Sequence, residues 1–172
     1  EDGDTIFVSS GTTATQVVTS IPAEARVTVV TSNLQAALEV REARFERILL
    51  GGTLYRRSNA AVGLFAMENL RRMTANKTFI GADGISLKFG YTVPSNPEAE
   101  LVRLMIERTH GSVIVVADHS KWGIVSNYAI AAIDQIHTLV TDDGLDAGAR
   151  AELKARSVAV LIAGSDVNRD GK

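Results

Sequence analysis

A short polar segment interrupts an apolar run near the start of the chain. The sequence SSGTT occupies positions 9–13, directly after the apolar residues 5–8. Gly11 lets the backbone approach a ligand closely. Thr12 and Thr13 would be the first residues of a helix, where free backbone N–H groups favour binding of an anion such as phosphate. The pattern is typical of an anion-binding loop, although a serine or threonine before a helix is more often an N-cap.

Similar polar residues follow four later apolar runs, and together they form the predicted binding site. Hydroxyl and backbone groups would hold the anion, Lys121 would supply a full positive charge, and Asp83 would accept hydrogen bonds from sugar hydroxyls. Because ligands of parallel sheets bind beyond the carboxyl ends of the strands, we expect these residues to converge at one edge. The predicted contacts are Ser10, Gly11, Thr12, Thr13, Thr31, Ser32, Asn33, Gly51, Gly52, Asp83, Gly84 and Lys121.

Other common site motifs are absent from the sequence. The glycine-containing loop is followed by no Gly-Lys-Ser/Thr, and a G-x-G-x-x-G dinucleotide fingerprint is missing here. The three histidines, His110, His119 and His137, lack the spacing of metal ligands. We therefore predict an organic anion as ligand, with no metal, no cofactor and no catalytic residue.

Strand-like and helix-like segments alternate along the chain. Runs rich in β-branched and aliphatic residues predict strands at 5–8, 26–31, 45–50, within 77–84, and at 112–118, 136–143 and 157–163. Helical spacing of apolar residues predicts helices at 12–20, 33–40, 64–73, 97–109 and 147–156. This alternation predicts an α/β fold with a mainly parallel sheet and helices on both faces. The segments 53–61 and 85–96 are expected to be the longest loops.

Composition restricts the class of protein. The chain has 172 residues, of which 45% are hydrophobic and 22% charged, as expected for one globular domain. Its net charge of −2 does not indicate the basic surface that direct binding of nucleic acid requires. The absence of cysteine favours a cytoplasmic protein, and no apolar run is long enough to predict a membrane span. A strand almost at the first residue suggests a fragment, with a native start as the alternative.

Seven motifs occur in an order that resembles the C-terminal effector-sensing domain of DeoR-family bacterial transcriptional regulators. The resemblance covers residues 2–163, and each motif alone is weak. The motifs are SSGTTA, VVTSN, LLGG, FIGADG, PEAELVRLMI, VVADHSKWG and LVTDDG.

The resemblance implies the fold of ribose-5-phosphate isomerase and the coenzyme A transferases. It implies a sensor domain over 1–163 and an N-terminal helix-turn-helix domain outside this chain that contacts operator DNA. The composition of residues 164–172, GSDVNRDGK, predicts a flexible tail. The expected function is repression of carbohydrate catabolism in response to a phosphorylated sugar or a related anion. A homodimer or homotetramer that makes no membrane contact is also implied.

Two positions depart from the family pattern. Ser9 stands where the family often has aspartate, and Val102 stands where it commonly has lysine. If that lysine helps to hold the phosphate, one cation is missing here, and Arg103 cannot simply replace it because neighbouring helix positions point about 100° apart. The effector is therefore expected to be less charged, or differently placed, than a typical sugar phosphate.

Two other classes of function compete with the sensor. A sugar-phosphate isomerase-like enzyme would need a carboxylate base and a group that stabilises an enediolate, but Asp83 is followed by glycine rather than by a second acid. An oligomerisation module with a vestigial cavity is the third class, and Val102 gives it some support. We favour the sensor over both.

Overall fold

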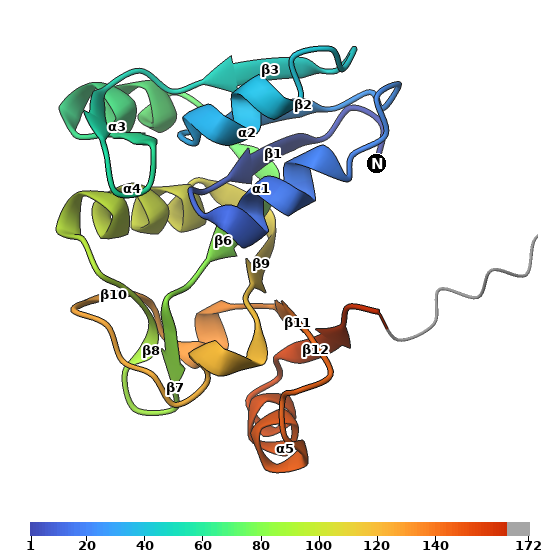
Figure 1. The fold of residues 1–172 in the computed structure, drawn as a ribbon, viewed down its shortest axis with the longest axis vertical. Helices are drawn as coiled ribbons and strands as arrows, with labels where there is room; N and C mark the ends of the chain where they lie inside the picture. Colours follow the sequence, from blue (N-terminus) through green and yellow to red (C-terminus); the bar gives the residue numbers. More distant parts are fainter. Residues whose placement is uncertain (165–172) are drawn as a thin grey trace, which may run out of the picture.

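The computed structural model describes residues 1–164 and is built on a seven-stranded sheet (Figure 1). Its strand order is β12-β11-β9-β6-β1-β2-β3, and all six strand pairs are parallel. The strands are β1 (Thr5–Val8), β2 (Thr28–Thr31), β3 (Glu46–Leu49), β6 (Ala75–Gly81), β9 (Thr109–Val116), β11 (Thr138–Thr141) and β12 (Ala159–Ile162).

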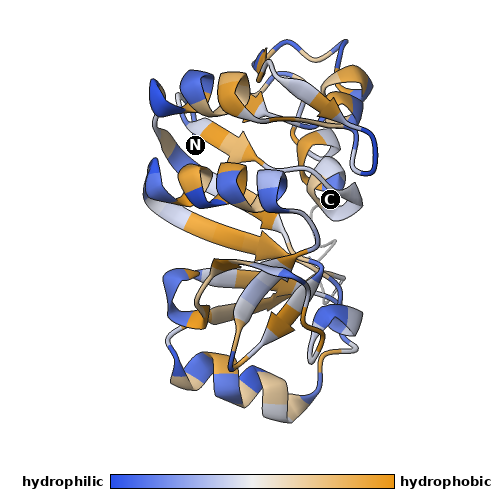
Figure 2. Cartoon of the chain, turned by 90° about the vertical axis from the view of Figure 1, so that its left-hand side faces the viewer, coloured by the Kyte–Doolittle hydropathy of each residue, from blue (hydrophilic) through white to orange (hydrophobic). Residues whose placement is uncertain are grey.

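Helices cover both faces of this sheet, which confirms the predicted fold class. In β1, Ile6 and Val8 belong to the cluster that includes Ala14 and Ala36 of the first two helices, whereas Phe7 packs with Leu70 and other residues on the opposite face. Figure 2 shows apolar strands between helices that are polar outside and apolar inside. The helices are α1 (Thr12–Thr19), α2 (Leu34–Glu39), α3 (Leu64–Arg71), α4 (Asn96–Glu107) and α5 (Ala147–Ala155), with short 3₁₀ helices η1 (His119–Lys121) and η2 (Ile133–Gln135).

The two segments expected to be long loops are instead antiparallel strands. Residues 53–61 contain most of the hairpin formed by β4 (Thr53–Tyr55) and β5 (Ala60–Val62). Residues 85–96 contain most of β7 (Gly84–Ser86) and all of β8 (Gly90–Val93), which join β10 (Tyr128–Ala131) in a three-stranded sheet. These segments contain no continuous apolar run like those of the main sheet, so their sequences resemble turns.

The strand order reverses between β1 and β6. From β1 the chain proceeds through β2 to β3 on one side, and from β6 it proceeds through β9 and β11 to β12 on the other. In open parallel sheets such a switch point leaves a crevice beyond the carboxyl ends of the two strands, and ligands bind there. The fold therefore places a crevice between the segments that follow Val8 and Gly81.

Two further sequence expectations concern the ends of the chain and membranes. Residues 165–172, most of the predicted tail, lie outside the described residues. Within residues 1–164, no helix has the length and apolar character needed to cross a bilayer.

A substitution at Gly52 tests how the β4–β5 hairpin packs. A β-carbon at Gly52 would lie 2.5 Å from the carbonyl oxygen of Val62, so Gly52→Ala forces the start of β4 away from β5. We expect the free energy of unfolding to fall by about 1–3 kcal/mol in urea titrations.

The adjacent Gly51→Ala is the matched control for this experiment. Its β-carbon would meet only Asn69 Oδ1, at an ordinary 3.5 Å, and we expect a change within about 0.5 kcal/mol. Equal stability of the two variants would contradict the packing described for the hairpin.

Candidate functional site

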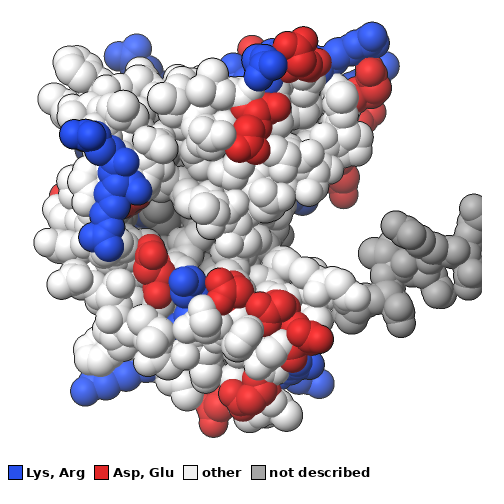
Figure 3. All heavy atoms as spheres, viewed as in Figure 1, with Lys and Arg blue, Asp and Glu red and all other residues white. Residues whose placement is uncertain are grey.

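A cavity of about 410 Å³ opens at the switch point of the sheet. It lies among the first turn of α1, the β4–β5 hairpin, one face of α4 and the segments that follow β6 and β9, and we call it the effector cavity. Figure 3 shows a hollow in this face of the molecule, with lysine and arginine atoms along one side and charges of both signs on its lower rim. Seven predicted contacts line the cavity: Ser10, Gly11, Thr12, Thr13, Asn33, Asp83 and Lys121.

The first turn of α1 leaves backbone donors without partners at the cavity. Gly11 is the N-cap residue, with φ of 118° and no side-chain cap. Thr15 is the first residue of α1 whose backbone N–H donates a hydrogen bond, to the Gly11 carbonyl over 3.0 Å. Among the described residues, the N–H groups of Thr12, Thr13 and Ala14 have no acceptor. The expected serine or threonine N-cap is therefore wrong, because the left-handed backbone conformation at this position favours glycine.

Asn33 holds this turn in place from the next loop. Its side-chain nitrogen donates to Thr15 Oγ1 over 2.9 Å and to the Gly11 carbonyl over 3.4 Å. Its side-chain oxygen accepts from the N–H of Ala36 and caps α2. The Asn33 side chain lines the cavity but is occupied by protein groups, so it positions the turn of α1.

The two serines before Gly11 are also tied to neighbouring elements. Ser10 Oγ donates to Glu98 Oε1 over 3.0 Å, and Ser9 Oγ accepts from the N–H of Gly81 over the same distance. Ser9 therefore links the ends of β1 and β6. A hydroxyl serves this link well because it both donates and accepts, whereas an ionised aspartate only accepts.

Two hydroxyl residues predicted as ligand contacts do not line the cavity. Thr31 is buried, donates to the Val8 carbonyl over 2.8 Å and accepts from the N–H of Asn33 over 3.0 Å. Ser32 is also buried, and its carbonyl accepts from the N–H of Ala61 in the hairpin. Both residues satisfy backbone groups around the loop that carries Asn33.

Three glycines predicted as ligand contacts also lie outside the cavity lining. The N–H of Gly51 donates to Asn69 Oδ1, and Gly52 packs against the backbone of β5. Gly84 begins β7, where a β-carbon would lie 2.5 Å from the carbonyl oxygen of Ile124. Gly52 and Gly84 thus permit close packing of backbone segments.

Asp83 and Lys121 place opposite charges at the effector cavity. Asp83 is exposed, but partial desolvation of its carboxyl at the cavity raises the pKa of this group; the nearby Glu98 also raises this pKa, whereas Lys121 and Arg57 lower it. Within residues 1–164, the Lys121 ammonium has no hydrogen-bond or ion-pair partner. Lys121 ends η1, whose N-cap Asp118 accepts from the N–H and hydroxyl of Ser120, and the hydroxyl contact lowers the pKa of Asp118.

The cavity also contains residues outside the set of predicted contacts. Glu98 is buried and accepts from Ser10 and, over 2.7 Å, from Ser95 Oγ. Arg57 lines the cavity from the hairpin and has no hydrogen-bond partner within the described part of the chain. Val102 forms an apolar part of the wall. No motif marks Arg57, because its place at the cavity depends on how the hairpin folds over the strand ends; Glu98 and Val102 lie in the motif PEAELVRLMI.

One histidine lies beside the cavity in a polar cluster. His119 Nδ1 is 2.7 Å from Asp142 Oδ1. The side-chain atoms of Asp118, His119 and Asp142 that could coordinate a metal lie within 4.8 Å of one another. The His119–Asp142 hydrogen bond accounts for much of this closeness, and acidic side chains often gather at an exposed surface without an ion. The sequence prediction of no metal site stays a prediction.

Comparisons with a family model and with individual proteins point to the same family. The family described as "DeoR C terminal sensor domain" matches residues 1–143. The transcriptional regulator GlpR of Haloferax volcanii is 34% identical over 160 residues, covering 93% of this chain and 62% of that protein. The putative aga operon repressor of Escherichia coli O157:H7 is 28% identical over 165 residues, covering 95% of this chain and 61% of the repressor. The chain thus spans less than two thirds of these relatives.

Among solved structures, ribose 5-phosphate isomerase A from Neisseria gonorrhoeae has a similar fold. The TM-score is 0.50 at 12% identity, over 74% of this chain and 48% of the isomerase. The beta subunit of eIF2B from Chaetomium thermophilum gives the same TM-score at 18% identity, over 74% of this chain and 37% of the subunit. Such low identity supports the fold alone.

The raised pKa of Asp83 predicts a pH-dependent effect of Asp83→Asn. A carboxyl whose pKa is higher in the folded state stabilises the fold while protonated and loses that contribution as pH rises through the folded pKa. At pH 7 the charge of Asp83 is slightly unfavourable, and because the residue is exposed and screened by solvent we expect asparagine to raise the melting temperature by only about 1 °C. The gain should disappear below the ordinary value of 3.8, where Asp83 is protonated in both states.

Differential scanning calorimetry at pH 7 and pH 3 measures this difference. Asp134→Asn, at an exposed position away from the cavity, is the control and should leave the melting temperature unchanged at both pH values. A lower melting temperature for Asp83→Asn at pH 7 would mean that attraction to Lys121 outweighs the cost of burial.

Proposed function

The chain belongs to the DeoR C-terminal sensor domain family, and we propose that its effector cavity binds an anionic, hydroxylated metabolite such as a phosphorylated sugar. The observation that carries this proposal is the pairing of free backbone N–H groups at Thr12 and Thr13 with the unpaired Lys121 at one cavity. Both features favour a negative group. Asp83 and Asp118 line the same cavity and offer acceptors for hydroxyl groups.

The cations at the cavity differ from the pattern that the family resemblance implies. Val102 contributes no charge, and Arg57 reaches the cavity from the hairpin. A guanidinium binds phosphate or carboxylate through two parallel hydrogen bonds, whereas an ammonium acts as a point charge. We infer that Arg57 supplies the second cation and that the anionic group lies between the first turn of α1 and the hairpin.

The family and its curated relatives are transcriptional regulators, not enzymes. In the cavity, the Glu98 carboxylate already accepts two serine hydroxyls, and this fixed carboxylate is better suited to positioning Ser10 than to moving protons. The distant similarity to an isomerase concerns the fold, so the isomerase-like alternative is not favoured.

The proposed mechanism is thermodynamic linkage within a longer regulator. The relatives are named as helix-turn-helix regulators or repressors, and we propose that this chain is joined to such a domain, which contacts operator DNA. Effector binding would favour one arrangement of subunits and change how the DNA-binding domains match their half-sites. Coupling of this kind is typically worth about 1–3 kcal/mol.

Removal of the free ammonium tests the proposed site. A thermal-shift screen with sugar phosphates and the corresponding free sugars should first show stabilisation by a phosphorylated compound. For that compound, Lys121→Ala should raise the dissociation constant about 10- to 100-fold in calorimetry, because a charge-assisted hydrogen bond is lost.

The control is Lys154→Ala, which removes an exposed lysine from α5 and should leave the affinity unchanged. Unchanged affinity in Lys121→Ala would contradict the assignment of the anion site. Stabilisation by none of the phosphorylated compounds would instead favour the oligomerisation module.

A further inference from the structure

Charged side chains of both signs line the effector cavity without pairing with one another. Three of them are acidic and two are basic: Asp83, Glu98, Asp118, Arg57 and Lys121. Within residues 1–164, no salt bridge joins any two of these five. A ligand that is only anionic would pair with the two cations and leave the three carboxylates without a counter-charge. The cavity is therefore better matched by a ligand that carries charges of both signs.

Glu98 is the most buried of these charged residues. Only 8% of it is exposed, and its two carboxylate oxygens accept hydrogen bonds from the hydroxyls of Ser10 and Ser95. An ionised carboxylate has about four acceptor positions, so two remain open. A buried charge without an opposite charge beside it is unfavourable, and a cationic group of a ligand would remove this cost.

Asp83 lies near enough to Glu98 for the two carboxylates to repel each other. Desolvation at the cavity raises the pKa of the Asp83 carboxyl, and repulsion from Glu98 raises it further. In the part of the chain that the structure describes, the Asp83 carboxylate accepts no hydrogen bond. Two neighbouring carboxylates favour a cation beside them, because it relieves their repulsion.

We propose that Asp83 and Glu98 bind a cationic amino group and that the effector is a phosphorylated amino sugar. The inference rests on the proposed function, which places the anionic group at the first turn of α1. Ser10, which donates to Glu98, directly precedes the N-cap Gly11 of that turn, so the two binding groups are close enough to hold one small molecule. An ammonium has three N–H donors and a full charge, and it satisfies two carboxylates better than a hydroxyl with one donor.

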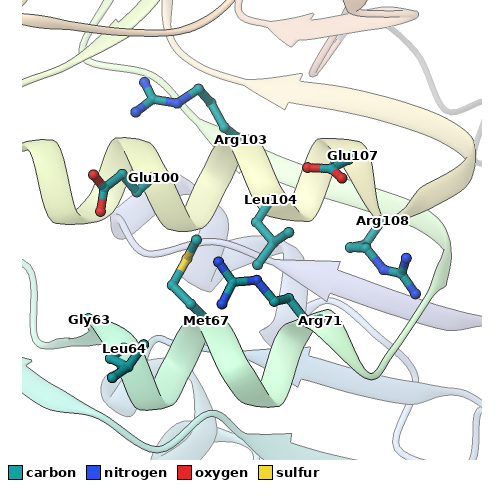
Figure 4. A pocket seen from close by; sticks show the side chains of 9 residues that line it. All are labelled: Gly63, Leu64, Met67, Arg71, Glu100, Arg103, Leu104, Glu107 and Arg108. Atoms are coloured by element: carbon teal, nitrogen blue, oxygen red, sulfur yellow. The ribbon is translucent and has the colours of Figure 1, made fainter.

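Helix α4 carries other glutamates that serve as matched controls. Figure 4 shows Glu100 and Glu107 beside a separate hollow of about 780 Å³ between α3 and α4, which we call the α3–α4 groove. At about 100° per residue, Glu107 lies on the face of the helix opposite to Glu98. Glu107 is exposed, so its change to glutamine alters the charge of α4 without altering the effector cavity.

Calorimetry with matched pairs of ligands tests the amino subsite. The probes are glucosamine 6-phosphate and galactosamine 6-phosphate, each compared with the hydroxyl counterpart, glucose 6-phosphate or galactose 6-phosphate. In at least one pair, the amino compound should bind about 10-fold or more tightly, because it adds a charge-assisted hydrogen bond. The N-acetylated form of that compound, in which a neutral amide replaces the amine, should lack this advantage.

Substitutions show whether the two carboxylates cause the difference. Glu98→Gln removes the charge but keeps the size and an acceptor for Ser10, and it should abolish most of the advantage of the amino compound. The affinity for the hydroxyl compound should change by less than about 3-fold, since no charged contact is lost there. Asp83→Asn, at an exposed position, should act in the same direction and keeps the test decisive if Glu98→Gln fails to fold. Glu107→Gln should leave both affinities unchanged.

The outcomes separate this inference from the proposed function. Equal binding of the amino and hydroxyl members of both pairs would overturn the amino subsite and leave the anion site standing. An advantage of the amino compound that survives both Glu98→Gln and Asp83→Asn would also overturn it. Binding of none of the phosphorylated compounds would contradict the proposed function itself, and this inference with it.

Discussion

The site depends on one backbone constraint, the left-handed conformation of Gly11 at the start of α1. With φ of 118° and no side-chain cap, this residue turns the chain from β1 into the helix and leaves the first N–H groups directed at a cavity. A serine or threonine cap would have satisfied one of these donors internally. The hydrogen bonds from Asn33 and Thr15 to the Gly11 carbonyl keep the turn rigid, so the donors are positioned before any ligand arrives.

Helix α4 connects this cavity to the surface of the molecule. Its N-cap Ser95 and the buried Glu98 form a hydrogen-bonded unit with Ser10, next to the anion-binding turn. The other face of the helix borders the α3–α4 groove. A buried polar group that is fully satisfied specifies one arrangement of its neighbours. A ligand that competes for Ser10 therefore acts on an element that reaches from the cavity to the surface, which gives the proposed linkage a physical route.

The sequence predicted the parallel sheet and seven of the residues that line the cavity, because apolar strands and strand-end polar residues carry clear patterns. It failed at the β4–β5 hairpin, whose three-residue strands show no periodicity, and so it did not place Arg57. It could not separate Thr31, which binds neighbouring backbone groups, from Asn33, two residues later at the cavity. It also did not pair Ser10 with Glu98, which lies 88 residues away, because such contacts are set by tertiary packing.

The central claim is that the first turn of α1 binds the anionic group of a metabolite, and an NMR titration tests it most directly. The ¹⁵N amide resonances of the chain would be followed as inorganic phosphate, and then the sugar phosphate found by thermal shift, is added. The account predicts the largest shifts at Gly11, Thr12 and Thr13, with saturation, and smaller shifts in η1. Saturating shifts confined to another part of the molecule, or an unchanged spectrum at Thr12 and Thr13, would contradict it.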